Sequence, residues 1–284
     1  MKNMKRLFFT ALILVFAAFG FHSCEQESDT IELGYVLWDS EIASTHVVAA
    51  IIEDKLGHDV SLTAVDAGPM WMGISRGDFD AMVAAWLPVT HEAYYKKTKD
   101  KIVNLGANLE GAKLGLVVPS YVTISSIDEL NDNADKFEGK IIGIDPGAGL
   151  MAAAERAIED YDIELNLVAG SDAAMTAALR RAIEREEWIV VTGWTPHWKF
   201  AAFDLKYLED PKKSLGEEEH IATIVTPELE DKAPEVYAFL DNFYWSSVEM
   251  AEVMMLIENG MEPYEAARKW IADNPERVNS WITE

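Results

Sequence analysis

The chain has 284 residues, of which 49% are hydrophobic and 26% are charged, a composition typical of a globular protein with one large domain or two smaller ones. Its 49 acidic side chains outnumber its 24 basic ones, and the formal net charge is -25. A surface of this sign repels phosphate backbones, which argues against nucleic acid as a partner and favours ligands with a cationic group. An acidic surface that only keeps the protein soluble is the alternative.

The N-terminal residues have the pattern of an export signal. Basic residues precede an apolar run over 7–21, which is shorter than a membrane span of about 20 residues but has the length of a signal-peptide core. Cys24 follows and is the single cysteine, so no internal disulfide can form. The segment resembles a bacterial lipoprotein signal. That resemblance implies a signal peptide over 1–23, a lipidated Cys24 with a tether over 24–30, and a globular part outside the cytoplasm. An ordinary secretory signal or an uncleaved anchor is the alternative.

Strand and helix signals alternate along the rest of the chain. Alternating or continuous apolar runs predict strands, and apolar residues at helical spacing predict the helices between them. The first helix has Ser40 as its expected N-cap and Gly57 as its stop, and Ser126 begins a capping box. The expected strands are 31–37, 60–65, 79–86, 113–118, 140–145, 165–169, 188–192 and 220–225. The expected helices are 41–56, 70–76, 150–161 and 171–186, followed by a mostly helical C-terminal part.

The order of these elements predicts an α/β protein of two lobes. Two β-α-β-α-β runs span 31–87 and 140–192, and we expect the chain to cross between lobes near 113–120 and to return near 193–210. Ligands of such proteins bind where strand ends and helix N-termini face the crevice between lobes. The resulting division gives a first lobe of 31–115 plus 205–284 and a second lobe of 116–204.

Three tryptophans, Trp38, Trp86 and Trp194, stand at the ends of predicted strands. Binding residues concentrate at such positions, and the indole ring is the strongest π-face for a cation. A quaternary ammonium group suits a box of tryptophans because it is weakly hydrated and donates no conventional hydrogen bond. Core packing is the alternative for each of the three. The other tryptophans are assigned to the core or the lobe surface: Trp71, Trp188, Trp198, Trp245, Trp270 and Trp281.

A glycine-rich turn over 145–150 joins a predicted strand to a predicted helix. Free N–H groups at such a helix N-terminus hold an anion well, although a plain tight turn is an equal alternative. Dinucleotide binding is not expected, because the full GxGxxG pattern is absent. His91 and His197 follow predicted strands. His91 could donate a hydrogen bond to a carboxylate, but loop histidines usually face solvent.

No pattern of a metal site or a catalytic nucleophile stands out. No two histidines have i,i+4 spacing and no cysteine pairs with one, so a metal site is not expected. The one Gly-x-Ser-x-Gly sequence, at 73–77, falls at the end of a predicted helix and not on the strand-to-helix turn of a nucleophile elbow. This argues against a hydrolase, and no cofactor is expected. Asp78 and Asp80 are interpreted as a solvated turn.

Five motifs resemble the glycine betaine-binding proteins of osmoprotectant ABC importers, the OpuAC/ProX-type substrate-binding family. The resemblance covers essentially all of 31–284, and its motifs are highly specific only in combination. They are YVLWDSEIAST at 35–45, AGPMW at 67–71, AWLPVTH at 85–91, GIDPGAG at 143–149 and TGWTPHW at 192–198.

The resemblance implies a type II periplasmic-binding-protein fold, whose two lobes close on the ligand, and no enzyme activity. It implies a cage of Trp38, Trp86 and Trp194 around the trimethylammonium group. It also implies that the backbone amides of Gly149 and Leu150, together with His91, bind the carboxylate. The implied partners are a separate ABC permease and its ATPase. Proline betaine, carnitine, choline or a sulfonium compound are the alternative ligands.

Overall fold

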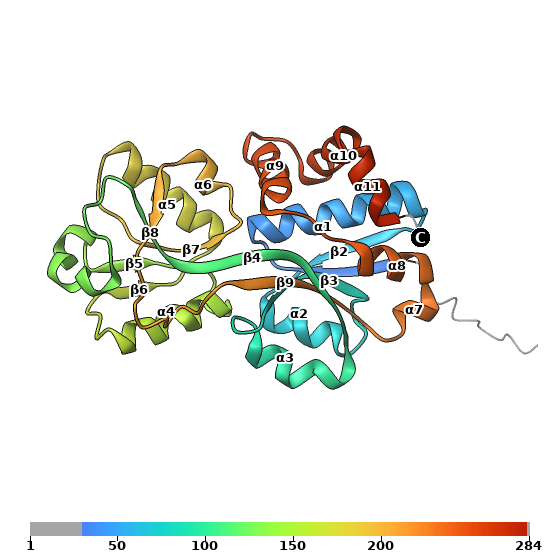
Figure 1. Cartoon of the computed structure of the whole chain (residues 1–284), viewed down its shortest axis with the longest axis horizontal. Coiled ribbons are helices and arrows are strands. Elements are labelled where there is room, and N and C mark those ends of the chain that lie inside the picture. Colours follow the sequence, from blue (N-terminus) through green and yellow to red (C-terminus); the bar gives the residue numbers. More distant parts are fainter. Residues whose placement is uncertain (1–29, 283–284) are drawn as a thin grey trace, which may run out of the picture.

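The protein is described here by a computed structural model covering residues 30–282. The predicted signal peptide, the lipidation of Cys24 and most of the predicted tether lie outside this described range. Two α/β lobes lie side by side along the long axis of the molecule (Figure 1). Their strands follow the order β2-β1-β3-β9-β4-β7-β5-β6, and β8 also pairs with β4.

The first lobe contains the N-terminal strands and the C-terminal helices. Strand β1 pairs in parallel with β2 and β3, and β9 runs antiparallel to β3. Helix α1 lies on one side of these strands beneath the C-terminal helices, and α2 and α3 lie on the other (Figure 1). The strands are β1 (Ile31–Tyr35), β2 (Val60–Ala64), β3 (Ala81–Leu87) and β9 (Glu219–Val225). The helices are α1 (Asp39–Ile51), α2 (Ala67–Ile74), α3 (Glu92–Thr98), α7 (Leu229–Lys232), α8 (Pro234–Asn242), α9 (Ser247–Glu258), α10 (Pro263–Asp273) and α11 (Pro275–Ile282).

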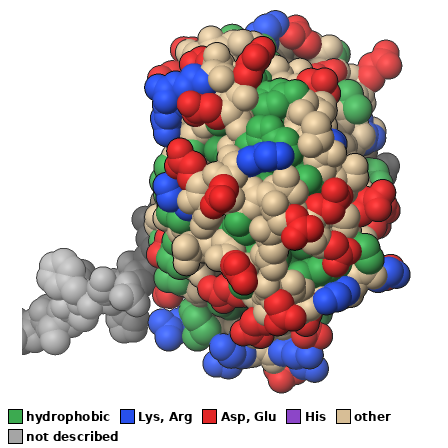
Figure 2. All heavy atoms as spheres, turned by 90° about the vertical axis from the view of Figure 1, so that its left-hand side faces the viewer, with side chains coloured by type: hydrophobic (Ala, Val, Ile, Leu, Met, Phe, Trp, Pro, Cys, Tyr) green, Lys and Arg blue, Asp and Glu red, His purple; other side chains and the backbone are tan. Residues whose placement is uncertain are grey.

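The second lobe is built on short strands. Strand β5 pairs in parallel with β6 and β7. Its strands are β5 (Lys140–Ile142), β6 (Asn166–Val168), β7 (Val191–Thr195) and β8 (Leu205–Tyr207), and its helices are α4 (Gly149–Asp160), α5 (Asp172–Glu184) and α6 (Lys199–Ala202). Acidic and basic side chains are interspersed on its outer face (Figure 2).

The long strand β4 (Val103–Pro119) connects the two lobes. Its first part pairs with β9, and from Lys113 onward it pairs with β7 and then with β8. The first crossing therefore lies where the sequence predicted it. The return differs, because β8 pairs with β4 in the second lobe and the chain goes back only along 208–218. Residues 205–207, which the predicted boundary assigned to the first lobe, thus belong to the second sheet.

Most expected elements form, with local differences. Gly57 ends the first helical stretch at a φ of 79°, a left-handed conformation that suits glycine, after a π-helical turn η1 (Ile52–Leu56). Ser126 forms its capping box, on a short 3₁₀ helix η3 (Ile127–Glu129). The predicted N-cap role of Ser40 is wrong, because α1 begins at Asp39. Trp38 occupies the N-cap position, and its side chain makes no capping hydrogen bond there.

Two acidic residues that were expected to form a solvated turn behave differently. Asp78 is exposed, but Asp80 is buried at the start of β3. Its Oδ2 accepts hydrogen bonds from the Glu32 backbone N–H and from Lys232 Nζ, each at 2.7 Å. Asp80 therefore ties β1 and α7 to this strand, which explains its burial.

The remaining tryptophans take structural positions. Trp71 is fully buried, and the C-terminal helices share an aromatic core in which Trp270 stacks on Trp281 at 6.0 Å and meets Trp245 edge-on at 5.9 Å. Trp188 is half-buried, as expected for a residue of the lobe surface. Trp198 is buried at the lobe interface, where its indole N–H bonds to Asp39 of the first lobe.

Candidate functional site

A small cavity lies between the two lobes. The residues from the first lobe come from the β1–α1 connection, the end of β3 and the turn after it. Those from the second lobe come from β7 and from the loop that opens α4. All six ligand-binding residues predicted from the sequence line this one cavity. The lining residues are Trp38, Ser40, Trp86, Thr90, His91, Leu114, Ile144, Ala148, Gly149, Leu150 and Trp194.

The three candidate cage tryptophans approach the cavity from both lobes and are almost fully buried, at 4–6% exposure. Trp38 precedes α1, Trp86 is the penultimate residue of β3 and Trp194 lies in β7. The Trp194 indole N–H donates to Ser40 Oγ at 3.1 Å, across the cleft. Three nearly desolvated indole rings thus lie at one cavity, and a cation gains most from rings that are desolvated.

His91 is buried, at 1% exposure, so the expectation of a solvent-facing histidine is wrong. The turn after β3 folds back, and the backbone N–H of Trp86 donates to His91 Nδ1 at 3.1 Å. Burial lowers the pKa of His91 to about 4. The ring is therefore neutral at physiological pH and carries its proton on Nε2, which makes that nitrogen a donor. The ring also stacks on Trp38, at 6.3 Å between centroids.

Gly149 and Leu150 form the first turn of α4. The N-cap residue, Ala148, has no side chain that could accept from the first N–H groups of the helix. Those groups, together with the helix dipole, favour an anion at this end. Glycine is required at 149, because a Cβ there would lie 2.3 Å from the Thr90 carbonyl oxygen of the opposite lobe.

The turn that contacts Gly149 is held by a buried glutamate. Glu219 Oε2 accepts the backbone N–H groups of Val89 and Thr90, each at 3.0 Å, and its Oε1 accepts from Thr90 Oγ1 at 2.6 Å. Glu219 begins β9, next to the end of β3. A charged acceptor at this point fixes the turn that carries both Thr90 and His91.

Further bonds connect the glycine-rich turn to the first lobe. The Trp38 indole N–H donates to Asp145 Oδ2 at 3.0 Å, and the Tyr94 hydroxyl donates to the Gly147 carbonyl at 2.9 Å. Both partners belong to the turn over 145–150, on the second lobe. The turn and the cage are therefore positioned against each other directly.

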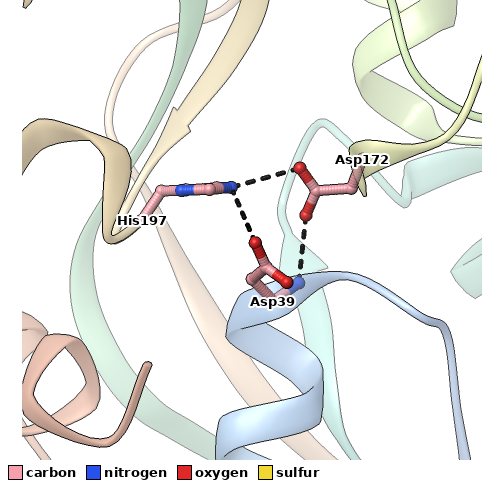
Figure 3. A group of neighbouring side chains, drawn as sticks. All are labelled: Asp39, Asp172 and His197. Atoms are coloured by element: carbon pink, nitrogen blue, oxygen red, sulfur yellow. Dashed lines mark hydrogen bonds and ion pairs between the residues drawn. The ribbon is translucent and has the colours of Figure 1, made fainter. Parts of the chain in front are cut away.

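A group of charged side chains lies beside the candidate cage, with Asp172 and His197 buried and the Asp39 side chain 29% exposed (Figure 3). His197 Nε2 is 3.2 Å from Asp172 Oδ1 and 3.7 Å from Asp39 Oδ2, and His197 is only 3% exposed. The solvent-facing position expected for His197 is therefore wrong. Burial, and then Lys199, lower the pKa of His197 to about 4, so the imidazole is neutral.

The same three side chains could form a metal site by geometry, since their ligand atoms lie within 4.8 Å of one another. Lys199, however, is fully buried nearby, and its charge interacts with both Asp39 and Asp172. A second cation is disfavoured there by this ammonium group. Within residues 30–282, no helix is long and apolar enough to cross a membrane.

Several of these residues escaped the sequence-based reasoning. Asp145 stood within a quoted motif, but nothing indicated its bond to Trp38. Glu219 and Lys199 contact the site across large sequence separations, so no local pattern could reveal them. Only long-range pairing of β3 with β9 and of β4 with β7 brings them to the cleft.

Two lobes joined by crossing strands, with a tryptophan-lined cavity between them, are the architecture of substrate-binding proteins with the type II periplasmic-binding-protein fold. The closed, glycine betaine-bound lactococcal OpuAC has this architecture: it superposes with a TM-score of 0.85 at 44% identity, over 89% of this chain and 99% of that one. The ProX protein described as binding glycine betaine and L-proline, from Borrelia burgdorferi, also gives a TM-score of 0.85, at 38% identity over 90% of this chain and 97% of that one.

Residues 29–273 match the family described as the substrate binding domain of ABC-type glycine betaine transport systems, and the chain belongs to that family. The glycine betaine/carnitine transport binding protein GbuC of Listeria monocytogenes serotype 1/2a (strain 10403S) is 45% identical over 162 residues. That match covers 56% of this chain and about half, 54%, of the relative.

Proposed function

We propose that this protein captures glycine betaine, and also proline betaine, and delivers it to the permease and ATPase of an ABC importer for osmoprotectant uptake. The observation that carries the proposal is the composition of the cavity between the lobes. Trp38, Trp86 and Trp194 line it with indole rings, and the α4 N-terminus and His91 line it with N–H donors. A small zwitterion with a quaternary ammonium group and a carboxylate suits both kinds of group.

The polarity of the donors supports this orientation of the ligand. A neutral His91 with its proton on Nε2 donates to a carboxylate and adds no positive charge beside the trimethylammonium group. The backbone amides of Gly149 and Leu150 add the helix dipole. No bond is made or broken in this binding, so we assign the protein no enzyme activity.

The proposed place of action is the outer side of the cytoplasmic membrane. The basic start, the apolar run and Cys24 of the sequence support export and a lipid anchor at Cys24. Metabolic labelling with a radioactive fatty acid tests this anchor. Label in the protein and none in a Cys24→Ser variant is the expected result, and an unlabelled protein would contradict it.

The second candidate is a binding protein for another quaternary ammonium or sulfonium compound, such as carnitine, choline or dimethylsulfoniopropionate. The name of GbuC, which includes carnitine, is the observation in its favour. Choline has no carboxylate and would leave the donors at α4 and His91 without a partner, which costs affinity.

Isothermal titration calorimetry of the purified protein with glycine betaine, carnitine and choline tests these alternatives. The proposal expects saturable heat with micromolar affinity for glycine betaine and little heat for choline. Tighter binding of carnitine or choline than of glycine betaine would replace the proposed ligand with that compound.

A further inference from the structure

Three consecutive residues at the start of α1 each bond to the opposite lobe. Trp38 donates its indole N–H to Asp145 at 3.0 Å, and Ser40 accepts the indole N–H of Trp194 at 3.1 Å. Asp39 lies between them and does not line the ligand cavity. Residues 38–40 thus touch the second lobe beside two cage tryptophans, and Asp39 does so without access to the ligand.

Asp39 enters a cluster of polar groups on the second lobe (Figure 3). Its Oδ2 accepts the indole N–H of Trp198, and its backbone N–H donates to Asp172 Oδ2 at 3.0 Å. The same Oδ2 lies 3.7 Å from Nε2 of His197, to which Asp172 is also bonded at 3.2 Å. Two carboxylates from opposite lobes therefore converge on one neutral imidazole.

The positive charge beside these carboxylates is smaller than their negative charge. Lys199 is the nearest cation, and its ammonium lies 4.2 Å from the centre of the Trp194 ring with no hydrogen-bond acceptor in the described structure. Farther out, Glu258 of α9 adds negative charge and is paired with Arg180 of α5. Burial lowers the pKa of Lys199 to about 7. Two carboxylates against at most one ammonium leave the cluster with a net negative charge, which is costly where water is largely excluded.

We propose that Asp39 is a positioning residue for ligand capture, and that closing the lobes takes up a proton into the cluster that Asp39 completes with Asp172, His197 and Lys199. The inference rests on the proposed function, since the ligand drives the closure. Asp39 and Asp172 belong to different lobes, so separation of the lobes would return Asp39 to water and end their mutual repulsion. Closure removes Asp39 from water and brings it back beside Asp172, and each of these changes favours a bound proton on Asp39.

The sign of the linkage follows from this change of surroundings. Burial, followed by the charge of Asp172, raises the pKa of Asp39 from 3.8 to about 6 in the closed structure, although Trp198 and Lys199 oppose the rise. The state with the higher pKa gains stability where the group is protonated. Affinity for the ligand should therefore rise as the pH falls from 7 to 5, by roughly tenfold for a pKa near 6.

Calorimetry of the full protein with glycine betaine, at pH 5, 6, 7 and 8 in pairs of buffers with different ionisation enthalpies, tests the inference. We expect the binding heat at pH 6 to depend on the buffer with the sign of proton uptake. At pH 8 that sign should be lost, because Asp39 is ionised there and any remaining proton exchange comes from Lys199, whose pKa burial lowers to about 7. An Asp39→Asn variant can still accept from Trp198 but cannot ionise. Between pH 5 and 6 it should bind with little pH dependence. The exposed Asp132→Asn, with the same charge change, should retain the parent profile.

Three outcomes would overturn the inference. Equal binding heats in both buffers at pH 6 would overturn proton uptake while leaving the proposed function intact, and this measurement needs no variant. If the Asp39→Asn variant kept the pH profile of the parent protein, Asp39 could not be the origin of that profile. Absence of heat with glycine betaine, carnitine and choline at every pH would overturn both the proposed function and the inference.

Discussion

Trp86 is the cage residue whose replacement isolates the cation site best, because Trp38 and Trp194 also bond across the cleft. A desolvated indole face contributes about 2 kcal/mol to a bound cation. Trp86→Ala should weaken glycine betaine binding at least tenfold, about 1.4 kcal/mol, when measured by calorimetry. Trp188→Ala, which removes a half-buried tryptophan outside the cavity, is the matched control. Equal affinities of the two variants would refute the cage.

His91 tests the carboxylate end of the same cavity. Its Nε2 proton has a partner in a betaine but none in choline, so His91→Ala should weaken glycine betaine binding much more than choline binding. Loss of the ring contact between His91 and Trp38 would weaken both ligands alike, so the difference between the two losses of affinity reports on the carboxylate alone. Fluorescence titration of both ligands on one protein sample measures the ratio. An equal loss for the two ligands would show that His91 acts only through packing.

Between elements, the contact of α4 with the turn after β3 controls how closely the lobes approach. An alanine Cβ at Gly149 would meet the Thr90 carbonyl oxygen at 2.3 Å, whereas one at Gly147 would meet nothing within 4 Å. Gly149→Ala should therefore reduce affinity more than tenfold, and Gly147→Ala should leave it nearly unchanged. Thermal unfolding without ligand should hardly change in either variant, because the clash exists only when the lobes are closed. A Gly149→Ala protein that binds like the parent would contradict this closed geometry.

The turn after β3 is also anchored to β9, through Glu219 at the start of that strand. Glu219→Ala would remove the carboxylate acceptor of the partly buried N–H groups of Val89 and Thr90, a loss of roughly 1–3 kcal/mol. Chemical denaturation should detect this loss, and the neighbouring, exposed Glu218→Ala should have little effect. Similar unfolding free energies for both variants would mean that the turn is held by other contacts.

The elements also show how far the sequence could be interpreted. Apolar periodicity located most strands and helices of the first lobe and α4 and α5 of the second, because those signals are local. The extent of β4 was underestimated, since Gly106 and Gly111 interrupt its pattern while β9 supplies the pairing through bulges. The β7 strand lies further along the chain than expected, at Val191–Thr195, because its register is fixed by β4.

For the site, motif resemblance named six of the eleven residues that line the cavity, but it could not predict what holds them. The burial of His197 and Lys199 beside Asp39 depends on how one lobe meets the other. Solvent exposure of loop histidines was the wrong expectation because both loops fold back into the interface between the lobes. Tertiary contacts of this kind leave no local signal in a single sequence.

At the scale of the whole molecule, we expect closure of the lobes and binding of the ligand to be one event. Each lobe carries part of the cage, and the Trp38–Asp145 and Trp194–Ser40 bonds form only when the lobes meet. A ligand that contacts both lobes favours the closed form by its differential affinity. Small-angle scattering should therefore show a more compact particle with glycine betaine than without it. An unchanged scattering profile on saturation would argue for a permanently closed protein.

The most direct test of the central claim is a crystal structure of the protein with glycine betaine. We predict the trimethylammonium group among the rings of Trp38, Trp86 and Trp194, and the carboxylate at the amides of Gly149 and Leu150 with His91 Nε2 as a further donor. A ligand bound outside this cavity, or bound with its carboxylate among the tryptophans, would contradict the account.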